Sequence, residues 1–152
     1  MKIILISDSH GNKTAIDNLI KSVDFDYLFF LGDGLKDLGA SANLENVIVV
    51  SGNNDFFSDV ANEKFFKLGE YNFFLTHGNA YGVKGGLSRL KQRAEELSAN
   101  IVCFGHTHKK MVDKLNNIYY INPGRFLQDK SGDFAGIQLI IDEQGIEIKN
   151  IE

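Results

Sequence analysis

The sequence predicts an α/β fold in which two β-sheets pack face to face and helices cover the outside. Short apolar runs rich in isoleucine, valine and phenylalanine recur along the 152 residues, and most end in glycine, asparagine or aspartate, which is typical of β-strands. There are roughly nine or ten such runs, with about two or three helical stretches between them. One sheet does not easily hold so many strands in so short a chain, so two packed sheets are the economical arrangement.

The first third of the chain alternates strands with helices. Residues 3–6 form a continuous apolar run, as expected for a strand that is covered on both faces. Asn12 offers a helix N-cap, and apolar residues then repeat at helical spacing from Ala15 to Val23. This β-α-β order favours parallel pairing through crossover helices. Two further strands are expected at residues 27–31 and 47–50, with a loop that contains a short helix at residues 33–44.

The pattern changes after Asp55, where the strands favour antiparallel pairs. Three short polar segments at residues 69–70, 116–117 and 143–145 each separate two apolar runs and indicate hairpins. The paired runs are 65–68 with 71–75, 111–115 with 118–121, and 137–141 with 146–148. Between the first two hairpins we expect a glycine-rich loop at 78–86, an amphipathic helix at 87–97 and a buried strand at 101–104. No repeat or linker interrupts the chain, so we expect one domain over residues 1–152.

The composition is that of an ordinary soluble globular protein. Apolar residues make up 43% and charged residues 24% of the chain, and the formal net charge of −4 gives no general attraction to nucleic acid or to an anionic membrane. The apolar stretch at residues 1–6 is too short for a signal peptide or a membrane span, so we expect cytoplasmic residence. The single cysteine, Cys103, lies in an apolar run and is expected to pack in the core.

All four histidines lie where strands are predicted to end. Polar motifs follow five of the apolar runs, and in an open α/β sheet ligands gather at the carboxyl ends of the strands. We therefore expect these side chains to lie close together. Their carboxylate, amide and imidazole groups form the mixed oxygen and nitrogen set of a transition-metal site. The candidate ligands are Asp8, His10, Asp33, Asn53, His77, His106 and His108.

The order of these motifs resembles that of the calcineurin-like metallophosphoesterase superfamily. The motifs are Asp8-Ser9-His10, Gly32-Asp33, Gly52-Asn53-Asn54-Asp55, Thr76-His77-Gly78 and Gly105-His106-Thr107-His108. The short length and the turn Asn122-Pro123-Gly124 are similar to the small bacterial and archaeal branch of phosphodiesterases, to which the retromer scaffold subunit is related. The resemblance implies the metallo-dependent phosphatase fold, a four-layer α-β-β-α sandwich in which two mixed sheets are flanked by helices.

The resemblance also implies a dinuclear metal centre with Asp33 as the bridge. One ion would be held by Asp8, His10, Asp33 and His108, and the other by Asp33, Asn53, His77 and His106. Paired ions of this kind hold a bridging hydroxide, screen the phosphoryl oxygens and stabilise the leaving oxygen. The ligand set suits manganese, nickel, iron, cobalt or zinc, and the sequence does not select among them.

Three positions depart from the superfamily pattern. Asn54 stands where many members carry histidine and much of the small branch carries cysteine, and an amide can donate a hydrogen bond but cannot act as a general acid. Asn79 replaces a further histidine, and Arg125 replaces the usual serine after the turn. Arg125 either grips a phosphate oxygen or lies on the surface, and Asp55 either takes part in the chemistry or caps a turn. Asn54, Asp55 and Arg125 are the candidate catalytic groups.

The resemblance implies a hydrolase, namely a metal-dependent phosphodiesterase that acts on a small phosphate ester. Two alternatives stay open: a protein-binding scaffold of the same fold, and a phosphate-ester sensor that binds metal without turnover. The presence of His10 argues against the scaffold, whose mark is erosion of the ligand set, especially of its first histidine. The sequence contains no basic patch that would favour a nucleic-acid partner. A homodimer or a higher homo-oligomer is left open.

Two further features have alternative interpretations. Tyr81 and the glycine-rich residues 82–86 form either a substrate loop or a flexible connection. Four pairs of adjacent phenylalanines are expected mainly in the core and in sheet packing, with an interface between subunits as the lesser alternative. The pairs are Phe29-Phe30, Phe56-Phe57, Phe65-Phe66 and Phe73-Phe74.

Overall fold

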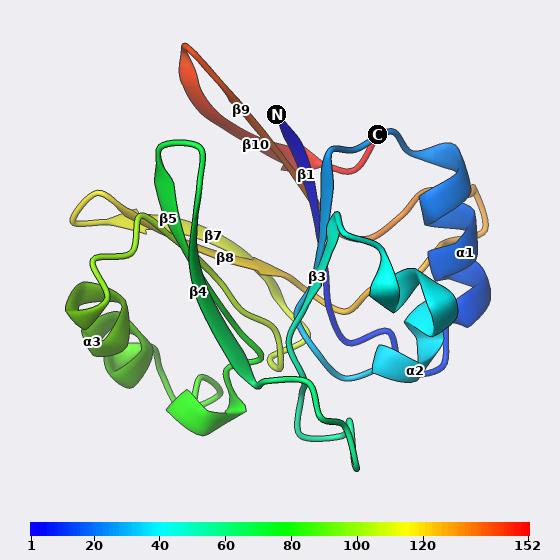
Figure 1. Cartoon of the computed structure of the whole chain (residues 1–152), viewed down its shortest axis with the longest axis horizontal. Coiled ribbons are helices and arrows are strands. Elements are labelled where there is room, and N and C mark those ends of the chain that lie inside the picture. Colours follow the sequence, from blue (N-terminus) through cyan, green and yellow to red (C-terminus); the bar gives the residue numbers. More distant parts are fainter.

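The computed structural model describes residues 1–152 and folds them into two five-stranded sheets (Figure 1). The first sheet has the strand order β10-β9-β1-β2-β3, and the second has the order β4-β5-β6-β8-β7. The strands of the first sheet are β1 (Lys2–Ile6), β2 (Tyr27–Phe30), β3 (Val47–Val49), β9 (Ile137–Asp142) and β10 (Gly145–Asn150). Those of the second sheet are β4 (Glu63–Leu68), β5 (Tyr71–Thr76), β6 (Ile101–Cys103), β7 (Lys110–Leu115) and β8 (Ile118–Pro123).

Each sheet combines three parallel strands with two strands that pair antiparallel. In the first sheet β1, β2 and β3 run parallel, while β9 and β10 add an antiparallel hairpin beside β1. In the second sheet β5, β6 and β8 run parallel, while β4 and β7 pair antiparallel with β5 and β8. The predicted parallel opening and the three predicted hairpins are confirmed. Ligands bind at the carboxyl ends of the strands in α/β sheets, so the ends of these parallel strands are where a site is expected.

The helices lie on the outer faces of the two sheets. Helices α1 (Lys13–Ser22) and α2 (Leu35–Leu38) cover the first sheet and α3 (Ser88–Glu96) covers the second (Figure 1). Two short 3-10 helices, η1 (Gly39–Asn43) and η2 (Asn79–Tyr81), lie in the connections. Asn12 precedes α1 as predicted, but its side chain makes no capping bond and donates to the carbonyl oxygen of Ser9 at 2.7 Å. No helix has both the length and the apolar character needed to cross a membrane.

Strand alternation divides the core into three layers. Ile3 and Leu5 point between the sheets and meet Phe73 and Leu75 of the second sheet. Ile4 and Ile6 point to the other side and pack against helix α1, while Leu90 and Ala94 of α3 pack on the outer face of the second sheet. Cys103 is buried between the sheets, as predicted, and burial raises the pKa of its thiol. The predicted four-layer α-β-β-α sandwich is confirmed.

The phenylalanine pairs differ in their burial. Phe29, Phe66 and Phe73 meet between the sheets, where the rings of Phe66 and Phe73 stack with centroids 5.8 Å apart. Core packing is therefore confirmed for these side chains. For the pair Phe56-Phe57 the prediction is wrong, because both residues lie on a turn and are 69% and 106% exposed. No glycine marks this turn in the sequence, so the local pattern resembles a buried pair.

Candidate metal centre

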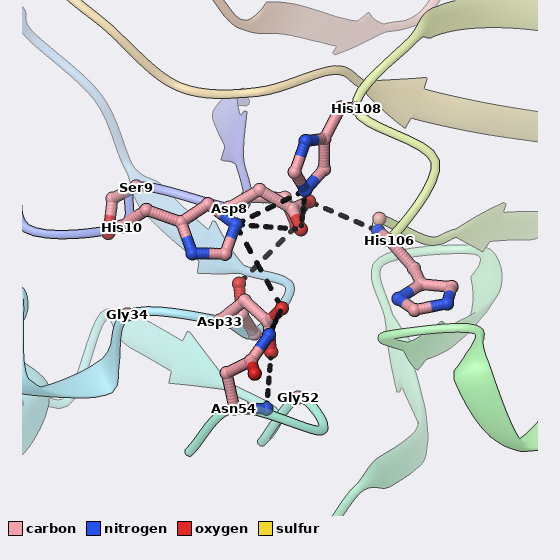
Figure 2. A network of polar contacts seen from close by, with 12 residues as sticks. Asp8, Ser9, His10, Asp33, Gly34, Gly52, Asn54, His106 and His108 are labelled. Carbon is pink, nitrogen blue, oxygen red and sulfur yellow. Dashed lines mark hydrogen bonds and ion pairs between the residues drawn. The ribbon is translucent and has the colours of Figure 1, made fainter.

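Six of the seven predicted ligands converge from the ends of parallel strands in both sheets. Figure 2 labels Asp8, His10, Asp33, His106 and His108 among them. Asp8 and His10 follow β1, and Asp33 follows β2 in the first sheet. His77 follows β5, while His106 and His108 follow β6 in the second sheet. Backbone hydrogen bonds tie neighbouring loops together: the Asp8 N–H donates to Gly32 O at 2.9 Å and the Gly105 N–H donates to His77 O at 3.0 Å. The strand ends thus fix the spacing of residues that are far apart in the sequence.

Six of the ligands form two clusters, each with ligand atoms within 4.8 Å of one another. We call the group of Asp8, His10 and His108 the outer cluster, because both of its histidines are exposed. We call the group of Asp33, His77 and His106 the inner cluster, because Asp33 and His77 are buried and His106 is half-buried. Each cluster combines one carboxylate with two imidazoles, a donor set that suits a divalent transition metal.

The outer cluster is arranged around a carboxylate oxygen that lacks a hydrogen-bond partner. Asp8 Oδ1 is buried and accepts no hydrogen bond, yet it lies 3.2 Å from His108 Nε2 and 3.8 Å from His10 Nε2. The two imidazole nitrogens are 3.1 Å apart, and Figure 2 shows both rings turned toward Asp8. A buried carboxylate oxygen without a donor is unfavourable unless a cation compensates it. This arrangement fits a bound metal ion.

The other oxygen of Asp8 is held in place by the protein. Asp8 Oδ2 accepts a hydrogen bond from Ser7 Oγ at 2.6 Å and another from the His106 N–H at 3.1 Å. These bonds orient the carboxylate so that Oδ1 faces the two exposed histidines. The backbone of His106, a residue of the inner cluster, therefore helps to aim a ligand of the outer cluster.

The inner cluster is built around a histidine ring that the backbone holds. His77 is fully buried, and its Nδ1 lies 2.7 Å from the Leu31 carbonyl oxygen, so Nδ1 carries the proton and donates. This leaves Nε2 facing the site, 3.4 Å from Asp33 Oδ2 and 3.2 Å from His106 Nδ1. A carbonyl partner on the far ring nitrogen is the usual device for orienting a metal-ligating histidine.

The charges of the inner cluster shift each other's pKa values. Burial acts to raise the pKa of Asp33, but hydrogen bonds from His77 and Asn54 outweigh burial and hold this pKa below its ordinary value. Burial acts to lower the pKa of His77, but the carboxylates of Asp33 and Asp8 outweigh it and raise this pKa. Burial, together with the positive charges of His77 and Lys84, lowers the pKa of His106. Asp33 thus stays ionised as a ligand should.

Asp33 lies between the two clusters and also contacts Asn54. Its Oδ2 is 3.4 Å from His77 Nε2 and 4.0 Å from His10 Nε2. Asn54 donates from its backbone N–H to Asp33 Oδ1 at 2.8 Å and from Nδ2 to Asp33 Oδ2 at 2.6 Å (Figure 2). The neighbouring Asn53 is exposed and its side chain makes no hydrogen bond. The bridging role of Asp33 and the ligand role of Asn53 stay predictions.

Asp55 joins the loop of residues 33–35, which carries Asp33, to the backbone at Gly52. Its carboxylate accepts hydrogen bonds at 2.8–2.9 Å from four backbone N–H groups, those of Asp33, Gly34, Leu35 and Gly52. All of these bonds fix backbone rather than reach into the site. They favour the turn-capping alternative for Asp55, in which it positions the Asp33 carboxylate through the loop that carries it.

Asp37 and Asn122 hold the other ligand loops, and the sequence patterns predicted no role for them. Asp37 Oδ2 accepts from Ser9 Oγ at 2.5 Å and from the Gly11 N–H at 2.8 Å, so it fixes the loop around His10. Asn122 is fully buried, and its Nδ2 donates to Gly105 O at 2.8 Å, which fixes the loop that carries His106. The only signal for Asn122 was its place in the Asn-Pro-Gly turn, and Asp37 lay in a weakly patterned loop.

Five of the ligands have left-handed backbone conformations, which non-glycine residues rarely adopt. Such conformations cost roughly 1–3 kcal/mol each and persist where the surrounding contacts over-determine them, often at functional sites. Close packing adds to the constraint, because a Cβ atom on Gly105 would lie 2.0 Å from Ser7 Oγ. The positive φ angles are 56° at Asp8, 43° at His10, 59° at Asp33, 67° at His106 and 59° at His108.

The remaining candidates lie around the site rather than in it. Arg125 is exposed and its side chain makes no hydrogen bond, although its backbone N–H donates to His108 O at 3.4 Å. Asn79 is also exposed. The Tyr81 hydroxyl donates to the Glu63 carboxylate, and its ring packs edge-on against Phe74, so Tyr81 is tied to the second sheet. A phosphate-binding role for Arg125 stays a prediction.

Two mixed sheets between helices, with clustered carboxylate and imidazole ligands at the strand ends, define the class of metal-dependent phosphoesterases. The sequence profile of the calcineurin-like phosphoesterase superfamily domain matches residues 1–142, and the chain belongs to this family. The resemblance stated from the motifs is therefore confirmed. The chain is a metal-dependent hydrolase of phosphate esters, and the two clusters offer the ligands that such an enzyme requires.

Among sequence relatives, the chain is 36% identical over 126 residues to the probable metallophosphoesterase YsnB of Bacillus subtilis, and the match covers 82% of this chain and 74% of that protein. It is 25% identical over 150 residues to the phosphodiesterase MJ0936 of Methanocaldococcus jannaschii, and this match covers 82% of this chain and 83% of that protein.

Solved structures share the fold over almost the whole chain. A conserved protein of Streptococcus pneumoniae matches with a TM-score of 0.77 and 23% identity, covering 98% of this chain and 97% of the other. A single-mutant form of Vps29 from Entamoeba histolytica matches with a TM-score of 0.73 and 17% identity, covering 99% of this chain and 98% of the other. These likenesses show the fold alone.

Proposed function

We propose that this phosphoesterase is a phosphodiesterase with a dinuclear metal centre. One divalent ion is held by the outer cluster and a second by the inner cluster, with Asp33 shared between them and Asn53 completing the inner set. The observation that carries the proposal is the buried, partnerless Asp8 Oδ1 facing two imidazole nitrogens, next to a second cluster of the same composition. When bound, such paired ions supply the attacking hydroxide and neutralise charge on the phosphoryl oxygens.

The chain's own residues position the reactants. The carboxylates of Asp8 and Asp33 are aimed by hydrogen bonds from Ser7, from the His106 backbone and from Asn54. The Asn54 amide lies beside the centre and can donate to a phosphoryl oxygen, but it has no proton to transfer to a leaving group. Arg125 is exposed and its backbone is bonded to the His108 loop, and in this proposal its guanidinium binds a phosphate oxygen of the substrate.

The diester preference rests on the relatives, whereas the missing general acid bears only on which leaving groups depart well. A leaving group that cannot be protonated departs best as a stable anion, which favours activated esters. The relative MJ0936 is named a phosphodiesterase, and YsnB is named a probable metallophosphoesterase. We therefore propose small diesters as the substrate class. The metal is one of manganese, nickel, iron, cobalt and zinc, all of which suit imidazole and carboxylate ligands.

Hydrolysis of two aryl esters tests the proposal directly. The metal-stripped chain is reconstituted in turn with manganese, nickel, zinc and magnesium, and initial rates are measured on bis-p-nitrophenyl phosphate and on p-nitrophenyl phosphate. We expect metal-dependent turnover that favours the diester. A preference for the monoester would overturn the diester assignment.

The dependence of rate on the leaving group tests the role of Asn54. Across a series of aryl methyl phosphates, we expect the rate to rise steeply as the pKa of the departing phenol falls, because no residue protonates the leaving oxygen. Asn54→His introduces a proton donor at the same place and should flatten this dependence. A shallow dependence in the natural chain would mean that another group supplies the proton.

The alternative of a scaffold is supported by the Vps29 fold likeness alone. A scaffold or a sensor binds ions without turnover, so elemental analysis combined with the hydrolysis assay separates it from the enzyme. Two ions per chain with no hydrolysis under any metal would favour these alternatives over the phosphodiesterase.

A further inference from the structure

A pocket of about 570 Å³ opens beside the metal centre and shares residues with it. His10, Asp33 and Asn54 are among its lining residues, and the others include residues of α2, η1 and the turn that follows Asn54. A group attached to a phosphorus atom at the centre can therefore extend directly into this pocket. The volume lies in the range of small-molecule sites, which run from roughly 300 to 1,000 Å³.

Two exposed phenylalanines form one wall of the pocket. Phe56 and Phe57 are 69% and 106% exposed, whereas the other large apolar side chains at the surface are less than half exposed. Phe57 also has a left-handed φ of 61°, a genuine strain for an aromatic residue. Exposed aromatic surface and strained backbone are both unfavourable for the free chain, and both concentrate where ligands bind.

The rest of the pocket combines apolar and polar surface. Leu35, Val49 and Val60 add apolar lining to that of the two phenylalanines. Lys36 and Asn43 also line the pocket, both without a side-chain hydrogen bond. A flat ring would lie against the apolar walls, and its polar edge or substituents would meet the free ammonium and amide groups.

We propose that this pocket, here called the aromatic pocket, binds a flat aromatic group carried by one ester arm of the substrate. Phe56 and Phe57 are then specificity-determining residues, because they contact this group and not the reacting atoms. The proposal rests on the proposed phosphoesterase site, which holds the phosphate of the same molecule. A nucleobase and a plain aryl ring share the required chemistry, and the experiment below separates them.

Equilibrium affinities of single-arm phosphate esters test the pocket without any need for turnover. The probes are methyl phosphate, phenyl phosphate and thymidine 5′-monophosphate, titrated calorimetrically into the metal-loaded chain. We expect the better of the two aromatic esters to bind about tenfold more tightly than methyl phosphate, since its ring is removed from water. Tighter binding of the thymidine ester assigns the pocket to a nucleobase, and tighter binding of phenyl phosphate assigns it to an aryl group.

Matched serine substitutions locate the effect. The double variant Phe56→Ser/Phe57→Ser should reduce the aromatic preference to about twofold or less, because it removes the apolar wall. Phe65→Ser, a change of the same kind at a half-exposed strand position outside the pocket, should keep the preference of the natural chain. Equal affinities for all three probes, or an unchanged preference in the double variant, would overturn the proposal.

The affinity measurements and the hydrolysis assay can each disprove one proposal without disproving the other. A chain that prefers aromatic esters but does not hydrolyse bis-p-nitrophenyl phosphate keeps the aromatic pocket and loses the phosphodiesterase assignment. A chain that hydrolyses the diester but binds all three probes equally loses the aromatic pocket and keeps the phosphodiesterase.

Discussion

The outer and inner clusters contain the same kinds of ligand but differ in how firmly the protein holds them. In the inner cluster His77 is fully buried, and a bond of 2.7 Å to the Leu31 carbonyl fixes its ring. In the outer cluster the side chains of His10 and His108 are 28% and 42% exposed, and neither ring contacts a backbone carbonyl. The ring of His77 is therefore held in place by the fold itself, whereas the outer histidines face solvent.

This difference teaches how two chemically similar sites can have separate tasks. Preorganised ligands lose less conformational freedom when an ion binds, so the inner ion should be held more tightly. The exposed cluster is the one that solvent and substrate reach, so its ion should exchange more readily. Asp33 lies between the two, because its carboxylate is within 4.0 Å of a histidine from each.

Asp33→Asn should have the largest effect, since it removes the carboxylate charge that we propose is shared by both ions. We expect loss of both ions and a fall in activity beyond about 100-fold, the upper end for residues that act only through a ligand. Elemental analysis and initial rates measure the two outcomes. Asp24→Asn makes the same chemical change at a fully solvated position and should alter neither. Retention of two ions in Asp33→Asn would contradict its bridging role.

Alanine substitutions of one histidine from each cluster should separate the clusters. His77→Ala removes a fully buried ring and takes away one partner of Asp33, which keeps its hydrogen bonds from Asn54. We therefore expect a stability loss of about 2–3 kcal/mol together with loss of the inner ion. His10→Ala removes an exposed ring, and the metal-free chain should change by less than about 0.5 kcal/mol. Urea unfolding of the metal-free variants checks both. Equal losses would break the comparison.

Substitutions of the two loop-holding aspartates should act on different clusters. Asp55→Asn weakens the four N–H bonds around the Asp33 loop, and Asp37→Asn weakens those around the His10 loop. Each should reduce metal affinity by about 10–100-fold, the range for residues that orient ligands. Metal titration should show the loss mainly at the tighter site for Asp55→Asn and mainly at the weaker site for Asp37→Asn.

Release of metal to a chelator should show, in the unaltered chain, that the two clusters lose their ions at different rates. We expect two kinetic phases, with the exposed outer ion leaving first and the inner ion following more slowly. His10→Ala should remove the fast phase and keep the slow one. A single phase in the natural chain would mean that the two ions leave together, as expected if Asp33 coupling dominates over burial.

Much of this arrangement was predictable because strand ends carry the ligands. Apolar runs located the strands, and the convergence of parallel strands at one edge placed Asp8, Asp33 and His77 together. The continuous apolar run at residues 3–6 likewise predicted a strand covered on both faces, as the structure has it. These features depend on short-range periodicity and on general rules of sheet topology, both of which a single sequence contains.

Other features depended on contacts that periodicity does not encode. The Phe56-Phe57 pair resembles the buried Phe29-Phe30 pair in the sequence, yet it lies on an exposed turn whose left-handed residue is not a glycine. Asp37 shows its role only through contacts with Ser9 and Gly11, which are distant in the sequence. The separation into a buried and an exposed cluster is also a property of the packed loops, not of the motifs.

The left-handed backbone at the ligand loops links the protein's stability to its metal supply. Without ions, the loops that follow β1, β2 and β6 hold strained residues around uncompensated charge. Their amides should exchange with solvent deuterium sooner than those of the parallel strands, because such regions open locally at low free energy. A bound ion stabilises only the closed loops and so protects the folded chain by mass action. Proteolytic lifetime in a metal-poor cell is therefore expected to be shorter than in a metal-replete one.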